Sequence, residues 1–375
     1  MSRRRVFFLG PLPPPVHGFS AINAKLVAAL SRDAEVTVFN RAMRSSEVEG
    51  RGRKAVADLF SSLQLWFSFV GQLFVRRPEA LYVGVSGGGG QWIDLVFVIF
   101  AKLFRVALVL HHHSFAYLNR PTTVSRILMR ASREATQVVL CNVMGELLAA
   151  KYSLDTSLMY VLSNAAFVDH NDDRASAPRR VLRVGFLSNI TEEKGIFDFL
   201  AVIGGLNANG LKIDARIAGP LADNVSDRFA DELRRLPCAT HVGPIYGEAK
   251  RRFLAELDIL LFPTRYVNEA EPVTVFEAMS AGLVVFAAKR SCIDEMIAED
   301  GGRVVDIDDF HRVVVENIIW LDADRESLFK AQCCAQKRFR MLSATSQVQL
   351  ETLVLRWASR ARPVASDSVN ERTAP

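Results

Sequence analysis

The feature that most constrains the fold is a regular alternation of short apolar segments with helical segments, which occurs twice along the chain. In the first half, strands are predicted at 4–10, 34–40, 80–86 and 106–113, with helices at 21–32 and 59–74. In the second half, strands are predicted at 181–188, 212–219, 239–245 and 258–264, with helices at 195–210, 225–236 and 247–257. Strands that alternate with helices form parallel sheets covered on both faces. The sequence therefore predicts two consecutive α/β units.

The length of 375 residues also favours two domains, because a single core seldom grows beyond about 250–300 residues. We expect the first domain at 1–168, a polar, proline-bearing linker at 169–180 and the second domain at 181–342. A C-terminal helix at about 343–362 is expected to pack back on the first domain. The tail at 363–375 has little to bury and is expected to be disordered.

The five cysteines are scattered, with no C-x-x-C pair and no histidine at metal-binding spacing. They are Cys141, Cys238, Cys292, Cys333 and Cys334. This pattern predicts reduced thiols in a cytosolic protein, without a disulfide framework or a structural zinc ion.

Neither a signal peptide nor a membrane span is expected. The apolar run at 6–9 is too short for a signal peptide. The tract at 92–110 is interrupted by charged residues, whereas a membrane span needs about 20 apolar residues, so we interpret it as a helix, a turn and a strand. We therefore expect a cytoplasmic protein.

The positive charge is concentrated in the first part of the chain. Residues 1–170 hold 19 Lys and Arg against 11 Asp and Glu, while the remainder holds 27 against 30. A basic half suggests an anionic partner such as a membrane surface, a lipid phosphate or nucleic acid, although an ordinary solvated surface explains it equally well. The helix with Trp66 and Phe67, which ends at Arg76 and Arg77, either contributes its apolar stripe to the core or lies on a membrane.

In open parallel sheets, ligands bind beyond the carboxyl ends of the strands, so the loops after the strands are the first places to examine. The loop after 4–10 opens a helix near Gly18, where backbone could approach a phosphate, although a rigid proline-rich turn is an equal alternative. The four glycines at 87–90 lack both common phosphate-loop spacings, and we favour a flexible loop there.

Three consecutive histidines end the strand at 106–113. Side chains alternate along a strand, so His111 and His113 are predicted to share one face and His112 the other. Their spacing does not fit a helical zinc site. We expect at least one of them to line the cleft between the domains.

The second half offers a lysine and three carboxylates after strands. Lys194 and Gly195 open a helix, so an ammonium group and a helix N-terminus would meet an anion together, although a solvated lysine is the simpler reading. Glu269 and Glu271 precede a proline, and Glu277 follows on the next helix. The backbone amides near Val273 and Thr274 are predicted to face the cleft.

These blocks resemble a known family. The stretch from Glu269 to Glu277 resembles the E-x7-E signature of the family-4 retaining glycosyltransferases, also called glycosyl transferases group 1, which have the GT-B fold. The segments around Lys194, "ARIAGP", "HVGPIYGEAKRRFLAELDILLFPT" and "GPLPPPVHG" match further family blocks in the same order, and the resemblance covers roughly residues 4–345. It implies two Rossmann-like, doubly wound domains that face a central cleft.

The resemblance also implies roles for individual residues, with a nucleotide-sugar donor bound mainly by the second domain. Glu277 would accept hydrogen bonds from the donor ribose, and Glu269 would contact hydroxyls of the donor sugar. Lys194 and the amides of Gly18, Val273 and Thr274 would hold the diphosphate, and His113 would face the donor sugar and the acceptor. The catalytic candidates are thus Glu269, His113 and Lys194, with no metal and no cofactor.

The sequence departs from the family pattern at two places. Ser188-Asn189 stand where the family usually has an arginine that clamps phosphate, and His17-Gly18 replace a glycine pair. Arg265 is a possible substitute for the missing arginine. A separate motif, Asp306-x-Asp308, resembles the metal motif of GT-A glycosyltransferases, but we favour a helix N-cap at Asp308 or Asp309.

The resemblance thus implies transfer of a sugar, expected to be a hexose, from a nucleotide sugar to a saccharide or polyprenyl-linked acceptor with retention of configuration. The expected setting is bacterial envelope or exopolysaccharide synthesis at the inner face of the cell membrane, without a nucleic-acid partner. Two alternatives stay open: a non-catalytic protein that binds nucleotide sugars or glycans, and a nucleotide-sugar epimerase of the same fold.

Overall fold

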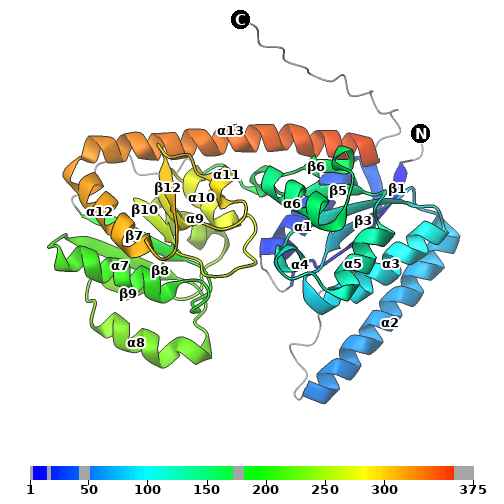
Figure 1. Cartoon of the computed structure of the whole chain (residues 1–375), viewed down its shortest axis with the longest axis horizontal. Coiled ribbons are helices and arrows are strands. Elements are labelled where there is room, and N and C mark those ends of the chain that lie inside the picture. The colour runs from blue at the N-terminus through cyan, green and yellow to red at the C-terminus, as the bar shows by residue number, and fades with distance from the viewer. Residues whose placement is uncertain (1–2, 15–17, 42–50, 172–180, 359–375) are drawn as a thin grey trace, which may run out of the picture.

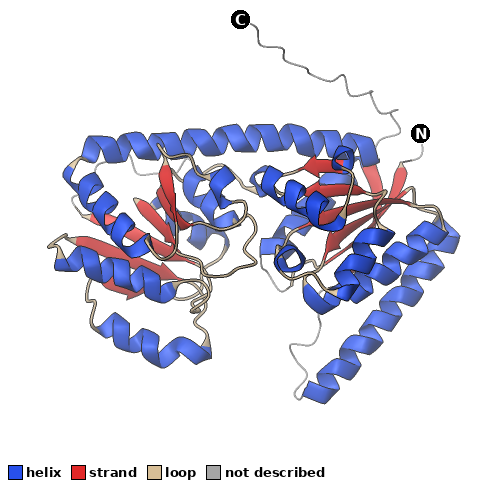
Figure 2. Cartoon of the chain, viewed as in Figure 1, coloured by secondary structure: helices blue, strands red, loops and turns tan. Residues whose placement is uncertain are grey.

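The computed structural model describes residues 3–14, 18–41, 51–171 and 181–358, with backbone alone for 51–60. Two α/β domains lie next to each other, and one long helix runs across both of them (Figure 1). Each domain contains a six-stranded sheet between layers of helices (Figure 2). The predicted α/β class with two doubly wound parallel sheets is confirmed.

The first sheet has the strand order β2-β1-β3-β4-β5-β6, with all pairs parallel. Its strands are β1 (Arg4–Gly10), β2 (Ala34–Asn40), β3 (Ala80–Val85), β4 (Ala107–His112), β5 (Thr136–Val139) and β6 (Met159–Val161). Its helices are α1 (Gly18–Asp33), α2 (Arg51–Arg76), α3 (Gln91–Leu103), α4 (Ala116–Asn119), α5 (Thr123–Ala131) and α6 (Asn142–Tyr152), followed by the 3-10 turn η4 (Asn164–Phe167). The strand order reverses between β1 and β3, which places a ligand crevice beyond their carboxyl ends.

The second sheet has the order β12-β11-β10-β7-β8-β9, again with all pairs parallel. Its strands are β7 (Leu182–Leu187), β8 (Ile213–Ala218), β9 (Ala239–His241), β10 (Ile259–Phe262), β11 (Val284–Ala288) and β12 (Gly302–Val305). Its helices are α7 (Ile196–Ala208), α8 (Ser226–Arg234), α9 (Gly247–Ala255), α10 (Val273–Ser280), α11 (Ile293–Met296) and α12 (Phe310–Ala323). Here the order reverses between β7 and β10, and the loops after these two strands carry Lys194 and Glu269.

Both faces of each sheet are buried, which explains the continuous apolar runs in the strands. In β1, Phe7 and Leu9 belong to the core shared with α2 and α3, whereas Val6 and Phe8 belong to the core on the α1 side. The alternation follows from the two-residue period of a strand. The segment 92–110 is a helix followed by a strand, as predicted, and no helix in the described ranges is long and apolar enough to cross a bilayer.

The apolar stripe on α2 is partly buried in the core and partly exposed. Phe69 and Leu73 are buried, and Trp66 packs partly buried against the same core. Phe67 and Phe74 are 76% and 66% exposed, although the ring of Phe74 packs edge-on against Phe104 with 4.8 Å between the ring centres. The stripe is therefore core along one line of the helix and exposed along a neighbouring line.

The helix α13 (Arg325–Ala358) connects the domains over 34 residues, as Figure 1 shows. Near its start, Leu328 belongs to the core of the second domain, and Phe339 packs against Phe276. Towards its end, Leu350 and Leu353 belong to the core of the first domain. The helix thus crosses back to the domain where the chain began, while the expected tail at 363–375 and most of the expected linker, 172–180, lie outside the described residues.

The expectation that all cysteines are reduced is wrong for two of them. Cys141 and Cys292 form a disulfide, with Cα atoms 5.8 Å apart although 151 positions separate them in sequence. Cys141 precedes α6 and Cys292 precedes α11, so each stands beyond the carboxyl end of a strand in a different domain. Sequence spacing does not reveal this proximity because it depends on how the two sheets face each other. Cys238, Cys333 and Cys334 are free thiols.

Candidate functional site

A cavity of about 990 Å³ lies between the carboxyl ends of the two sheets. It is lined from the first domain by the start of α1, the end of β4 and η4, and from the second domain by the loops after β7, β8, β9 and β10. All seven candidate residues line it: Gly18, His113, Lys194, Glu269, Val273, Thr274 and Glu277. The structure therefore brings together residues that are up to 259 positions apart, while their roles stay predictions.

The position of Lys194 depends on the glycine that follows it. Gly195 has a φ of +80°, and a Cβ atom there would lie 1.9 Å from the carbonyl oxygen of Pro263. Only glycine tolerates both the left-handed backbone and this close approach. The turn after β7 can therefore press against the end of β10, and this contact sets Lys194 beside the loop that carries Glu269.

Lys194 and Glu269 form an ion pair at the edge of the cavity. The Nζ atom of Lys194 lies 2.6 Å from Oε2 of Glu269, and both side chains are mostly buried. The same ammonium group lies 4.9 Å from the centre of the Tyr266 ring, a cation–π distance. A partly desolvated ammonium next to a carboxylate can bind two neighbouring groups of one ligand: the ammonium binds an anion, and the carboxylate accepts a hydrogen bond from a hydroxyl group.

The N-terminus of α10 opens toward the same cavity. Pro272 occupies the N-cap position and has no side-chain donor or acceptor, so α10 has no side-chain cap. The first amides of a helix lack partners within it, and Val273 and Thr274 supply such amides here. Pro272 thus stands one position before the first helical residue, Val273.

Glu277 lies one turn inside α10 and is paired with a lysine that the sequence analysis missed. Lys250 on α9 donates a hydrogen bond to Oε1 of Glu277. The other oxygen, Oε2, is buried and has no hydrogen-bond partner among the described residues. A buried carboxylate oxygen without a donor is costly, so this atom is poised to accept a hydrogen bond from a ligand. Charged residues on amphipathic helices such as α9 are common, and nothing in its spacing singled out Lys250.

The three histidines divide between the faces of β4 as predicted. The rings of His111 and His113 lie 3.9 Å apart on one face, and Phe19 packs 4.5 Å from His113. His112 is on the other face, where its ring nitrogens share hydrogen bonds with Tyr117 and Gln137. His113 is the one that lines the cavity, and its Nε2 atom is buried without a partner among the described residues.

Burial keeps these imidazoles neutral. It lowers the pKa of His113 from 6.5 to about 3, with a further contribution from His112. It lowers the pKa of His112 to about 4, although the hydrogen bond with Gln137 acts in the opposite direction. At neutral pH His113 is therefore an uncharged hydrogen-bonding group.

Glu271, which the resemblance left without a role, joins the two domains. Its carboxyl oxygens accept hydrogen bonds from the Ser163 hydroxyl at 2.7 Å and from the Asn164 amide at 2.5 Å, both in the first domain. Burial raises its pKa from 4.5 to about 8, although both hydrogen bonds act to lower it. The position next to Pro272 gave no hint of this contact, which requires knowledge of the domain arrangement.

Arg265 does not stand in for the missing family arginine. Its guanidinium group makes two 2.7 Å hydrogen bonds to the carboxylate of Asp198, and it does not line the cavity. Ser188 and Asn189 do line the cavity, as neutral groups. The positive charges that line it come from Lys194, Lys250, Lys25 and Arg251.

Two other sequence motifs take structural positions. The glycines at 87–90 form a turn that leads into α3 and lie outside the cavity lining. Asp309 is the N-cap residue of α12, but its side chain makes no cap and instead accepts a hydrogen bond from Arg312. No cluster of three or more potential metal-ligating side chains occurs within the described ranges.

Comparisons with known proteins agree with this geometry. Residues 170–334, nearly all of the second domain, match the family model of the Glycosyl transferases group 1. No curated protein sequence matches the chain. Match and fold together define the class: a two-domain GT-B protein whose second domain carries the pattern of the group 1 glycosyltransferases.

Solved structures of low sequence identity share the whole fold. Anabaena Alr3699/HepE in complex with UDP and glucose is 15% identical, with a TM-score of 0.66 over 93% of this chain and 100% of that chain. Sucrose-phosphate synthase from Thermosynechococcus elongatus is 12% identical, with a TM-score of 0.69 over 94% and 98%. The lipopolysaccharide outer core galactosyltransferase WaaB is 12% identical, with a TM-score of 0.66 over 94% and 99%. Together with the family match, these likenesses support a glycosyltransferase.

Proposed function

We propose that the protein is a glycosyltransferase that moves a sugar, a hexose, from a nucleotide-sugar donor to a saccharide or lipid-linked saccharide with retention of configuration. We assign it to bacterial envelope or exopolysaccharide synthesis. The observation that carries the proposal is the arrangement of Lys194, Glu269 and Glu277 around the N-terminus of α10 in one interdomain cavity. The fold shared with HepE, solved with UDP-glucose, makes UDP-glucose the first donor to test.

The charged and polar groups that line the cavity suit the three parts of such a donor. Oε2 of Glu277 accepts a hydrogen bond from a ribose hydroxyl, and Lys250 fixes the orientation of this carboxylate. The Lys194 ammonium and the amides of Val273 and Thr274 hold the diphosphate. In a nucleotide sugar the reacting carbon is bonded to the terminal phosphate, so the phosphate and the sugar are neighbouring groups. Lys194 and Glu269, whose charged atoms lie 2.6 Å apart, can bind these neighbouring groups, the lysine the phosphate and the glutamate the sugar.

Catalysis then consists of assisting departure of the nucleoside diphosphate. As the bond to the sugar breaks, negative charge grows on the leaving phosphate, and Lys194 with the helix N-terminus stabilises it. Gly18 contributes an amide from the facing domain, and neutral His113 donates or accepts a hydrogen bond on the side where sugar and acceptor meet. We assign no protein nucleophile and route no step through a metal.

We propose further that the first domain contacts an anionic membrane surface through the outer face of α2, α3 and α5. This face is apolar and exposed, with Phe67, Phe74, Trp92 and Leu103 each more than half exposed. The basic residues on α3, α5 and residues 61–76 of α2 are Lys102, Arg126, Arg130 and Arg76, and the last of these pairs with Glu35. The acidic residue on these segments, Asp94, is buried and paired with Arg41. Apolar side chains with basic neighbours suit an interface with anionic lipid.

Donor binding and turnover test the main proposal. Titration of a panel of nucleotide sugars in a thermal-shift assay is expected to raise the melting temperature for one donor, because a ligand that binds the folded state stabilises it. That donor should then release nucleoside diphosphate slowly without an acceptor. Binding without release would favour the non-catalytic alternative, and conversion of the donor to its epimer would favour the epimerase.

Flotation with liposomes tests the membrane contact. Wild-type protein is expected to float with vesicles that contain anionic lipid at low salt, and the Phe67→Ser/Phe74→Ser double variant to float less. The matched control is Phe329→Ser, which changes an exposed phenylalanine on α13 in the second domain. Equal flotation of all three proteins, or none by the wild type, would contradict the assignment.

A further inference from the structure

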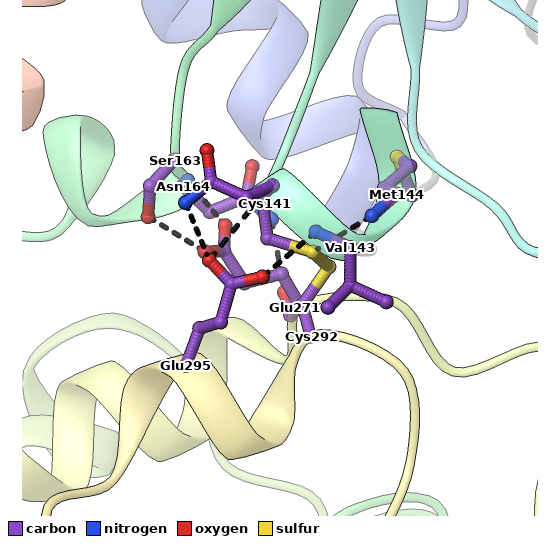
Figure 3. The surroundings of a disulfide bond; sticks show 9 residues. Cys141, Val143, Met144, Ser163, Asn164, Glu271, Cys292 and Glu295 are labelled. Carbon is purple, nitrogen blue, oxygen red and sulfur yellow. Dashed lines mark hydrogen bonds between the residues drawn. A yellow bond between two sulfur atoms is a disulfide. The ribbon is translucent and has the colours of Figure 1, made fainter. Parts of the chain in front are cut away.

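A covalent link crosses the junction between the domains beside the cavity. Cys141 stands after β5 in the first domain and Cys292 after β11 in the second, and the two are 3% and 0% exposed. Figure 3 shows the disulfide between the start of α6 and the start of α11. Any movement that separates the domains at this point would have to stretch or break the bond.

Two glutamate side chains of the second domain reinforce the same junction. Glu295 on α11 accepts hydrogen bonds from the amides of Asn142 and Val143, at 3.2 and 2.9 Å, at the N-terminus of α6. Glu271 accepts hydrogen bonds from Ser163 and Asn164 at the same junction (Figure 3). Unlike the disulfide, these hydrogen bonds can break and re-form, so they do not prevent the junction from opening.

The disulfide is also connected to the loop that carries the candidate site. The backbone amide of Cys292 donates a hydrogen bond to the carbonyl oxygen of Ala270 at 3.3 Å. Ala270 lies between Glu269, which pairs with Lys194, and Glu271, which bonds the first domain. The side chains of Ala270 and Cys292 both pack into the core of the first domain. The loop after β10 is therefore fixed at one end by the residue that forms the disulfide.

We propose that Cys141 and Cys292 form a redox latch: the disulfide holds the domains together and fixes the loop of Glu269, and its reduction allows the cleft to open. The reductant is a dithiol. One of its thiolates attacks a cysteine sulfur, the Cys141–Cys292 bond breaks, and the second thiol closes the reductant's own disulfide, which leaves two cysteine thiols in the protein. Oxidised glutathione reverses the process by taking up the two electrons.

Because the disulfide is buried, its rate of reduction should depend on whether the cleft is closed. Because both sulfurs are buried, a dithiol reaches them only when the junction opens for a moment. A ligand that bridges the two domains keeps the junction closed and is expected to slow reduction. By linkage, reduction should in turn weaken the binding of such a ligand. This last step rests on the proposed function, whereas the latch itself does not.

The test uses the full chain in its oxidised and dithiothreitol-reduced forms. Peptide mapping without reductant should find Cys141 linked to Cys292 after treatment with oxidised glutathione. On reduction, X-ray scattering should show a larger radius of gyration, and amides in 265–272 and at the start of α6 should exchange hydrogen roughly tenfold faster. Cys141→Ser should resemble the reduced protein under both conditions.

The control is Cys333→Ser, which removes an exposed free thiol and should respond to reductant as the wild type does. If Cys141→Ser fails to fold, the reductant titration of wild-type protein gives the same information. No 141–292 link under oxidising conditions, or a radius and exchange rates unchanged by reduction, would overturn the latch. Ligand protection is measured separately with UDP-glucose, so failure of the proposed function leaves the scattering result interpretable.

Discussion

The two domains line the cavity with chemically different groups. The second domain contributes carboxylates paired with lysines, Lys194 with Glu269 and Lys250 with Glu277. The first domain contributes Gly18, the neutral imidazole of His113, which packs against Phe19, and Lys25, whose charge is paired with Asp169. The family model likewise matches only the second side. We infer that the second domain binds the charged part of a ligand by electrostatics, and that the first positions the less charged part by shape.

The largest expected effect comes from the lysine at the phosphate position. Lys194→Ala removes a charge-assisted contact worth about 1.5–3 kcal/mol and leaves Glu269 without its partner. Donor turnover, measured as kcat/KM, is therefore expected to fall about ten- to a hundredfold. Lys330→Ala, on an exposed lysine of α13, is the matched control and should turn over normally. Wild-type turnover in Lys194→Ala would refute the phosphate role.

A smaller loss is expected at the ribose position. Glu277→Gln keeps the shape of the side chain but weakens acceptance of a ribose hydrogen bond, so calorimetry should show nucleoside diphosphate affinity lowered roughly tenfold. Glu326→Gln, an exposed glutamate on α13, serves as the control. Unchanged affinity in a folded Glu277→Gln protein would show that Oε2 of Glu277 does not contact the ligand.

The histidines predict a pH dependence of stability in the first domain. Their folded-state pKa values, about 4 for His112 and about 3 for His113, lie below the unfolded value of 6.5, so the unfolded chain binds protons that the native state excludes. The free energy of unfolding should therefore fall as the pH decreases from about 6.5 toward 4, by up to about 3 kcal/mol for each of these two histidines. In thermal melts, the loss of stability on acidification should be smaller in His113→Phe than in the wild type. It should be the same as in the wild type in His311→Asn. Equal falls in all three proteins would contradict neutral burial of His113.

Glu271 at the junction predicts the opposite slope. Its folded-state pKa of about 8 lies above the unfolded value of 4.5, so the native state holds a proton that the unfolded chain loses. This contribution is fully present below about pH 4.5 and is lost as the pH rises through about 8. Between pH 5 and 9 the melting temperature should fall less with rising pH in Glu271→Gln than in the wild type. An undiminished fall in the variant would mean that a group other than Glu271 causes it.

The smallest expected effect is at Lys250. It pairs with the Glu277 carboxylate, to which we assign the ribose, and partly exposed ion pairs contribute little, about 1 kcal/mol or less. Lys250→Met should therefore raise KM a few-fold with kcat nearly unchanged. A large drop in kcat would mean that Lys250 acts on the leaving group, and the division of roles in the second domain would need revision.

The parts of the structure that were predictable depend on local pattern. The strand at 4–10 and the facing of the three histidines follow from the two-residue period, and the residues brought to the cavity follow from the rule that loops after parallel strands share an edge. The family resemblance added roles that neither period nor spacing supplies.

The parts that were missed depend on contacts between distant segments. The pairing of Cys141 with Cys292 and the contact of Glu271 with Ser163 both require the relative position of two domains. Arg265 was a reasonable phosphate clamp by position, but Asp198 on the neighbouring helix engages it. Such pairings are decided by tertiary packing, which a single sequence does not display.

The most direct test of the central claim is release of nucleoside diphosphate from the donor that gives the largest thermal shift, compared between wild type, Lys194→Ala and Lys330→Ala. Steady release is expected from the wild type and from Lys330→Ala, with at least tenfold slower release by Lys194→Ala at equal donor concentration. Equal rates in all three proteins, or no release by any of them in the presence or absence of acceptor, would contradict this claim.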